Sequence, residues 1–259
     1  MEEKALRLSA VFLMILTAVS FVLLPKLPAL HTWEVEAREE RIAEEEFAQS
    51  QVTMQNLKIK EQNEAAGAKG ELSIRLPEGV TGDQIAVSND YVTQTIRVEI
   101  PQADRTYFDS YPVLGNSDYI DGLSYTRQGE TGVIEVTTNK VYELQTEYDA
   151  QNFYFNFLTP HEVYDKVVVI DAGHGGRAVG ANKQGINEKD IDLAIVLKLK
   201  EIFDNSDQNI GVYYTRTDDS NPTFDQRVQL ANKSDADLFI SIHNNSTRSG
   251  RMSGTSGTQ

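Results

Sequence analysis

The chain has 259 residues and a formal net charge of -15, with 39 acidic against 24 lysine and arginine side chains. This surplus of negative charge argues against nucleic acid or an anionic lipid surface as the main binding partner. The chain contains no cysteine, so it can form neither disulfides nor thiolate metal sites, and histidine, aspartate and glutamate remain as the strong metal ligands.

Residues 8–24 form a continuous run of apolar and small side chains close to the N-terminus. A helix of this length spans roughly 26 Å at about 1.5 Å per residue, slightly less than a typical hydrocarbon core. Lys4 and Arg7 precede the run, which favours a cytoplasmic N-terminus. A signal-anchor and a cleaved signal peptide both fit, but no clean A-x-A cleavage site follows. We therefore expect residues 1–30 to anchor the chain as a single-pass membrane protein.

Residues 31–70 are rich in glutamate and poor in large apolar side chains. Val35 and Ile42 lie one heptad apart, but a coiled coil needs the repeat to continue over three or more heptads. The composition favours a solvated helical or disordered spacer. Such a spacer would hold the rest of the chain away from the membrane.

Residues 71–162 are rich in predicted strands. Apolar and polar residues alternate at 72–76, 93–100, 132–137, 142–146 and 153–157, with turn sequences at 127–132 and 149–152. Alternation with short turns predicts antiparallel sheet, and here a small β-sandwich. No cluster of histidine and acidic residues indicates chemistry in this region, so we interpret it as a structural or binding module.

The pattern changes to alternating strands and helices over residues 163–259. Apolar runs at 167–170, 211–215 and 238–243 predict buried strands, and helices are predicted at 190–203 and 224–233. Asn187 is the expected N-cap of the first helix. Its expected buried face consists of Ile191, Ala194, Ile195, Leu199, Ile202 and Phe203. This order predicts an α/β fold with a wound, mainly parallel and incomplete sheet flanked by helices.

A glycine-rich turn carrying His174 follows the first of these strands, and His243 ends the last one. Glu188 begins the helix after the first strand. Carboxyl ends of parallel strands and the helix N-termini that follow them share one sheet edge, so these three side chains should converge. Two imidazoles and one carboxylate are a typical set for a catalytic zinc ion. The alternative from the residues alone is two loop histidines that bind no metal.

Several motifs occur together in this part of the chain. They are Asp171-Ala-Gly-His-Gly-Gly176, Asn187-Glu188, Tyr214-Thr-Arg-Thr-Asp218, Arg227 with Ala231-Asn232, and Ser241-Ile-His-Asn-Asn245. In this order they resemble the zinc-dependent N-acetylmuramoyl-L-alanine amidases of the amidase-3 family. The resemblance implies Zn²⁺ held by His174, Glu188 and His243, and hydrolysis of the amide between N-acetylmuramic acid and L-alanine in peptidoglycan. We assign Arg227 and Asn232 only a packing role.

The resemblance extends weakly to the β-sandwich, which is similar in architecture and placement to the AMIN domains that localise such amidases to the cell wall. It implies a bacterial plasma-membrane protein whose bulk lies on the cell-wall side. Its partners would then be the membrane, through the N-terminal helix, and peptidoglycan. Whether a protein activator is needed, and which one, is left open.

The sequence departs from the family pattern at its C-terminal end. The family's general-base glutamate would lie beyond Gln259, so the chain reads as a C-terminally truncated form. Glu162 and Glu201 fall away from the predicted sheet edge and cannot replace it. We therefore expect this chain itself to be inactive. The alternative function is a membrane-anchored wall-binding protein with an inactive amidase domain.

Overall fold

The computed structural model describes residues 55–61 and 69–244. The chain divides into two compact units, Met1–Gln49 and Ser50–Gln259, and every described residue belongs to the second. The predicted membrane span and most of the acidic spacer lie outside the described residues. Within those residues, no helix is long and apolar enough to cross a membrane.

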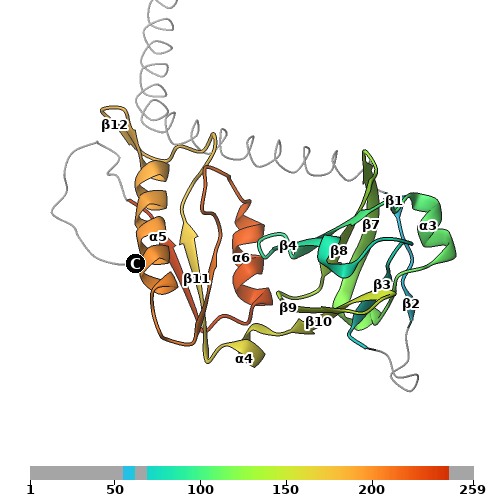
Figure 1. Cartoon of the computed structure of the whole chain (residues 1–259). Coiled ribbons are helices and arrows are strands. Elements are labelled where there is room, and N and C mark those ends of the chain that lie inside the picture. Colours follow the sequence, from blue (N-terminus) through green and yellow to red (C-terminus); the bar gives the residue numbers. More distant parts are fainter. Residues whose placement is uncertain (1–54, 62–68, 245–259) are drawn as a thin grey trace, which may run out of the picture. The chain divides into compact units, whose positions relative to one another are not determined.

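Two five-stranded sheets form the first part of this unit (Figure 1). One has the order β1 (Gln55–Asn56), β7 (Ile120–Gln128), β8 (Thr131–Thr138), β5 (Thr95–Pro101) and β4 (Ala86–Asp90). The other has the order β2 (Lys60–Glu61), β6 (Leu114–Gly115), β3 (Leu72–Arg75), β10 (Asn152–Leu158) and β9 (Glu143–Tyr148). The antiparallel pairing expected from the alternating sequence is confirmed, except that β2 and β6 are parallel.

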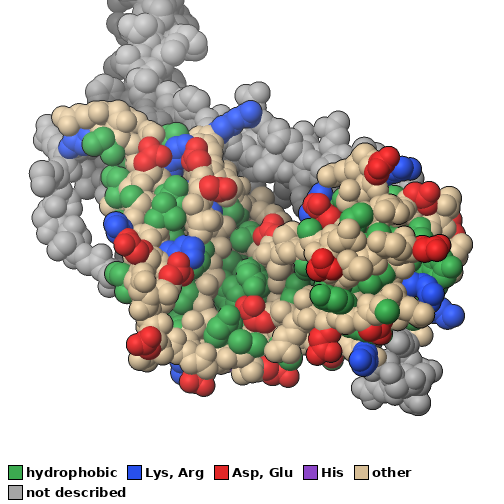
Figure 2. All heavy atoms as spheres, viewed as in Figure 1, with side chains coloured by type: hydrophobic (Ala, Val, Ile, Leu, Met, Phe, Trp, Pro, Cys, Tyr) green, Lys and Arg blue, Asp and Glu red, His purple; other side chains and the backbone are tan. Residues whose placement is uncertain are grey.

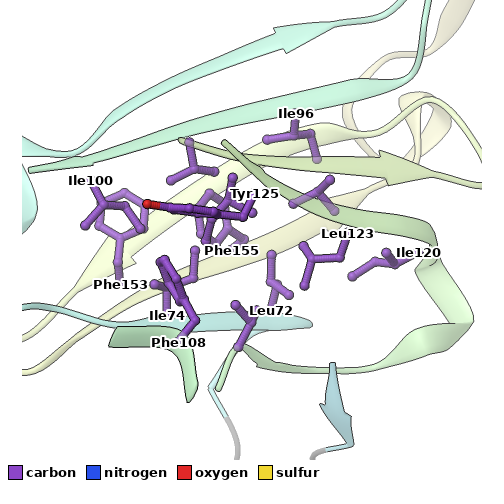
Figure 3. Packing of buried hydrophobic residues seen from close by; sticks show 14 of the residues in the cluster. Leu72, Ile74, Ile96, Ile100, Phe108, Ile120, Leu123, Tyr125, Phe153 and Phe155 are labelled. Carbon is purple, nitrogen blue, oxygen red and sulfur yellow. The ribbon is translucent and has the colours of Figure 1, made fainter. Parts of the chain in front are cut away.

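The two sheets share one apolar core. Every second residue is buried along both β5 and β10, which is the pattern of strands with one face turned inward. Figure 3 shows Ile96 and Ile100 from β5 packed with Phe153 and Phe155 from β10, and with Tyr125 from β7. Short helices lie among the strands: η2 (Gly82–Gln84), α3 (Arg105–Ser110), η3 (Ser117–Tyr119) and α4 (Pro160–Val163).

A three-stranded parallel sheet forms the second part, in the order β14 (Ile210–Tyr214), β11 (Lys166–Ala172) and β15 (Leu238–Ile242). Figure 1 shows α5 (Glu188–Asp204) and α6 (Phe224–Lys233) on either side of β11. Val169 of β11 packs with Leu230 of α6, whereas Ile170 packs with Val196 of α5. A small hairpin, β12 (Asn182–Lys183) and β13 (Ile186–Asn187), precedes α5. The parallel pairing predicted from the strand-helix alternation is confirmed.

The buried face of α5 agrees with the prediction only in part. Leu199 and Phe203 of the predicted face pack against the sheet core, but the buried residues of the helix are Glu188, Asp192 and Val196, which lie one helical turn apart. Ile195 and Ile202 of the predicted face are 39% and 65% exposed, and they line a shallow apolar groove. The apolar residues of α5 cover more than one face, so their spacing did not determine which face meets the sheet. Figure 2 shows hydrophobic side chains exposed between charged ones over this helix.

Candidate metal centre

His174 lies in a tight turn directly after β11. Its backbone is left-handed, with φ of 57°, which is uncommon for a residue with a side chain. Two glycines, one before His174 and one six residues after it, let the turn approach the other site residues. A Cβ at Gly173 would lie 2.4 Å from the His243 ring, and one at Gly180 would lie 2.6 Å from His174 Cδ2. Both glycines are therefore required for close packing around the two imidazoles.

The backbone of this turn is held by a buried pair, Asp171 and Arg227. Arg227 Nη1 donates to Asp171 Oδ1, and Nη2 donates to the His174 carbonyl at 2.8 Å. Thr215 and Ser241 donate to the two Asp171 oxygens, each at 2.6 Å. Burial alone would raise the pKa of Asp171, but the Arg227 charge and these hydrogen bonds lower it below its usual value. Arg227 thus positions His174, a more direct role than the packing role assigned from sequence.

Arg216 is a second arginine that fixes the site, and the motif that contains it, Tyr214–Asp218, did not predict this role. It is 3% exposed, and its guanidinium donates to the carbonyls of Ala172, Gly173 and Lys189 at 2.6–2.9 Å. The first two carbonyls belong to the turn and the third to the first turn of α5. Arg216 therefore ties the loop of His174 to the helix of Glu188.

The three predicted ligands converge. His174 Nε2 lies 3.4 Å from Glu188 Oε2, and His243 Nδ1 lies 3.3 Å from Glu188 Oε1. The two imidazole ring centroids are 4.8 Å apart. The convergence follows from the parallel sheet, because His243 comes directly after β15 and Glu188 is the first residue of α5. That these residues bind a metal stays a prediction.

Glu188 is held in its ionised form. Burial would raise the pKa of its carboxyl group, but backbone N–H groups of Ala181 and Asn244 donate to it, each at 2.8 Å. Together with the neighbouring histidines, these donors lower the pKa below its usual value. Asn187 precedes α5 as predicted, but its side chain makes no cap hydrogen bond and donates to Asp190 instead.

Asp192 joins this group, although the sequence pattern did not predict it as a ligand. His174, Glu188, Asp192 and His243 each offer one ligand atom, and these atoms lie within 4.8 Å of one another. Asp192 is fully buried, and its Oδ2 has no hydrogen-bond partner in the described part of the chain. Desolvation raises the pKa of this carboxyl group, and Glu188 adds to the rise. A buried carboxylate oxygen without a partner, beside two imidazoles and a second carboxylate, fits a bound cation.

The remaining candidate acids lie outside this group. Glu162 caps α4, where it accepts hydrogen bonds from Thr159. Glu201 forms an ion pair with Lys198 on the surface of α5. Both positions agree with their exclusion as general bases.

Part of the chain that contains this site matches a known protein family. Residues 168–258 match the Amidase_3 family, N-acetylmuramoyl-L-alanine amidase. The match therefore includes all three predicted ligands and Asp192.

Two relatives illustrate the similarity. Over 86 residues the chain is 45% identical to an endolysin of Bacillus phage SPP1, covering 33% of this chain and 31% of the endolysin. Over 78 residues it is 41% identical to the N-acetylmuramoyl-L-alanine amidase CwlM of Bacillus licheniformis, covering 30% and 31%. The chain spans about a third of the length of these curated relatives.

One similar solved structure is an N-acetylmuramoyl-L-alanine amidase from Clostridium difficile 630. It is 37% identical, and the alignment covers 34% of this chain and 48% of that one with a TM-score of 0.33.

Proposed function

We propose that this chain has the fold and metal site of a zinc-dependent N-acetylmuramoyl-L-alanine amidase, whose reaction is hydrolysis of the amide between N-acetylmuramic acid and L-alanine in peptidoglycan. The observation that carries the proposal is the convergence of His174, Glu188 and His243 at one sheet edge, inside the segment that matches the Amidase_3 family. The sequence motifs alone could occur without convergent ligands, whereas a metallohydrolase requires its metal ligands to lie close together.

His174, Glu188 and His243 would hold the ion. When bound, Zn²⁺ lowers the pKa of a coordinated water to about 7 and polarises the scissile carbonyl. Glu188 supplies negative charge, because its pKa is held low. The Arg227–His174 hydrogen bond fixes the backbone of the first imidazole. The side chain of His243 is 43% exposed, against 19% for His174 and 8% for Glu188, so His243 is the most exposed of the three proposed ligands.

Proton transfer to the leaving amine needs a further acid-base group. Glu162 and Glu201 lie away from the site, so no described residue is assigned this role. In this proposal, the N-terminal parts of the chain keep the amidase domain at the cell wall. Residues 1–30 would anchor it in the plasma membrane, 31–70 would act as a spacer, and 71–162 would bind the cell wall as an AMIN-like module.

The test is a paired measurement of metal content and turnover on the purified chain. We expect close to one zinc per chain, and loss of that zinc in a His174→Ala, His243→Ala double variant. Turnover is read as new L-alanine amino termini released from peptidoglycan, with and without a chelator. The chain itself is expected to release little or none, and a chimera that adds the C-terminal segment of a relative should release these termini in a chelator-sensitive way. Zinc binding without release by that chimera, together with sedimentation on peptidoglycan, would instead support the wall-binding protein with an inactive amidase domain. Full zinc occupancy in the double variant would contradict the metal assignment.

A further inference from the structure

We propose that Asp192 is a fourth protein ligand of the ion, so that two imidazoles and two carboxylates hold it. This inference rests on the metal site proposed above and adds a ligand that neither the sequence pattern nor the usual three-ligand set of catalytic zinc predicts.

Asp192 shares a face of α5 with Glu188. It lies four residues after Glu188, and residues with this spacing share one helix face. Both side chains are buried, at 0% and 7% exposure. A ligand atom from each, together with one from each histidine, lies within a 4.8 Å group. The helix thus presents two carboxylates, not one, to the imidazoles.

Asn244 orients both carboxylates. Its backbone N–H donates to Glu188 Oε1 at 2.8 Å, and its side-chain Nδ2 donates to Asp192 Oδ1 at 2.6 Å. This residue directly follows His243, so one strand end delivers an imidazole and fixes two acids. The arrangement leaves Asp192 Oδ2 buried and without a partner among the residues that the structure describes.

The buried Asp192 Oδ2 has no hydrogen-bond partner among the described residues. Leaving a buried polar group unsatisfied costs about 1–3 kcal/mol, and more when the group is charged. A residue that served only to position Asn244 would need one oxygen, and because Asp192 is fully buried its second oxygen has no access to solvent. A divalent cation would satisfy this oxygen and balance the two carboxylate charges. The protein would then supply two nitrogen and two oxygen ligands, and a coordinated water would be the fifth ligand.

The experiment compares the full chain with Asp192→Asn, using Co²⁺ as a spectroscopic probe and Zn²⁺ for X-ray absorption. Asparagine keeps the volume and an oxygen that accepts from Asn244, but loses the charge. We expect Asp192→Asn to weaken metal binding about tenfold or more and to change the visible Co²⁺ spectrum. In X-ray absorption of the Zn²⁺ form, one oxygen bound to the metal should be lost. Asp190→Asn is the control, because Asp190 is exposed on the same helix. It should change none of these readouts.

A second variant separates a ligand from a positioning residue. Asn244→Ala removes the hydrogen bond to Asp192 but leaves both carboxylates, so binding should weaken while the number of first-shell ligands stays the same. An Asp192→Asn spectrum and first shell identical to those of the unsubstituted chain would overturn the inference and leave the three-ligand site intact. Failure of the unsubstituted chain to bind metal would overturn the proposed metal site itself.

One measurement does not depend on how well the variant folds. In the unsubstituted Co²⁺ form with ¹³C-labelled aspartate, one aspartate carboxyl carbon should show a large hyperfine shift. Absence of any such shift in the Co²⁺-loaded chain would overturn the assignment of Asp192 as a ligand.

Discussion

Single residues at this site are held by long-range contacts. The left-handed backbone of His174 costs of order 1–3 kcal/mol unless its surroundings enforce it. Arg227 enforces it from α6, some 50 positions along the chain, through the His174 carbonyl and the Asp171 carboxylate. The sequence could identify His174 by its position after a strand and Glu188 by its position at a helix start. It could not give the role of Arg216, because an arginine at a strand end is usually a solvated side chain.

The Asp171–Arg227 pair makes a prediction about pH. The pKa of Asp171 is lower in the folded protein than in the unfolded chain, where it is about 3.9. The stabilisation by this carboxylate is therefore complete above that unfolded value and disappears as the pH falls through the lower folded pKa. Asp171→Asn should be destabilised by about 3–5 kcal/mol at pH 7, because it leaves the buried Arg227 unpaired.

The measurement is the urea midpoint of the chain and of Asp171→Asn from pH 7 to below pH 4. The difference between the two should be constant near neutrality and shrink only in the acid range. Asp190→Asn, an exposed change, serves as the control for general acid effects. A difference that stays constant to the lowest pH at which both fold would contradict the lowered pKa.

At the level of elements, the strands and helices were predictable, and their contacts were less so. A run of β-branched residues predicted β11, and the strand-helix alternation predicted its parallel neighbours. Helix α5 was also placed correctly, but the face that packs on the sheet was predicted only in part. Asp192 reads in sequence as a solvent-facing acid, yet it lies in line with Glu188 and Val196 on the buried face. The signal that could have revealed it is this spacing of four residues from a predicted ligand.

Two neighbouring residues of α5 test this orientation. Val196 is fully buried between α5 and the sheet, so Val196→Ala should destabilise the fold by about 2 kcal/mol through lost burial and a residual cavity. Ile195 is 39% exposed, and Ile195→Ala should cost less than about 1 kcal/mol although it removes more atoms. Chemical unfolding of both variants checks the order. The reverse order would mean that α5 packs through the face predicted from its apolar spacing.

At the scale of the whole molecule, the described residues contain three apolar clusters. One is the sandwich core around Phe155, one lies between the parallel sheet and α5 around Ile170, and the third contains residues of both regions. The third cluster brings Val141 of the sandwich region together with Val167 and Tyr213 of the parallel sheet. Glu143 accepts hydrogen bonds from Tyr213 at 2.6 Å and from Tyr91 at 2.9 Å. The Glu143–Tyr213 hydrogen bond and this cluster couple the parallel sheet to the β-sandwich. Sequence patterns within each region could not predict that bond, because it joins residues 70 positions apart.

Metal removal tests the site at this scale. An ion that binds only the folded chain stabilises it by about 2.7 kcal/mol when its free concentration is 100 times Kd. For a described region of this size, each kcal/mol shifts Tm by roughly 2–4 °C, so a chelator should lower Tm by about 5–11 °C. The shift should be absent in the His174→Ala, His243→Ala double variant, because it has lost two of the ligands. Calorimetry with and without chelator measures both. A chelator effect of the same size in the double variant would show that the stabilising ion binds elsewhere in the chain.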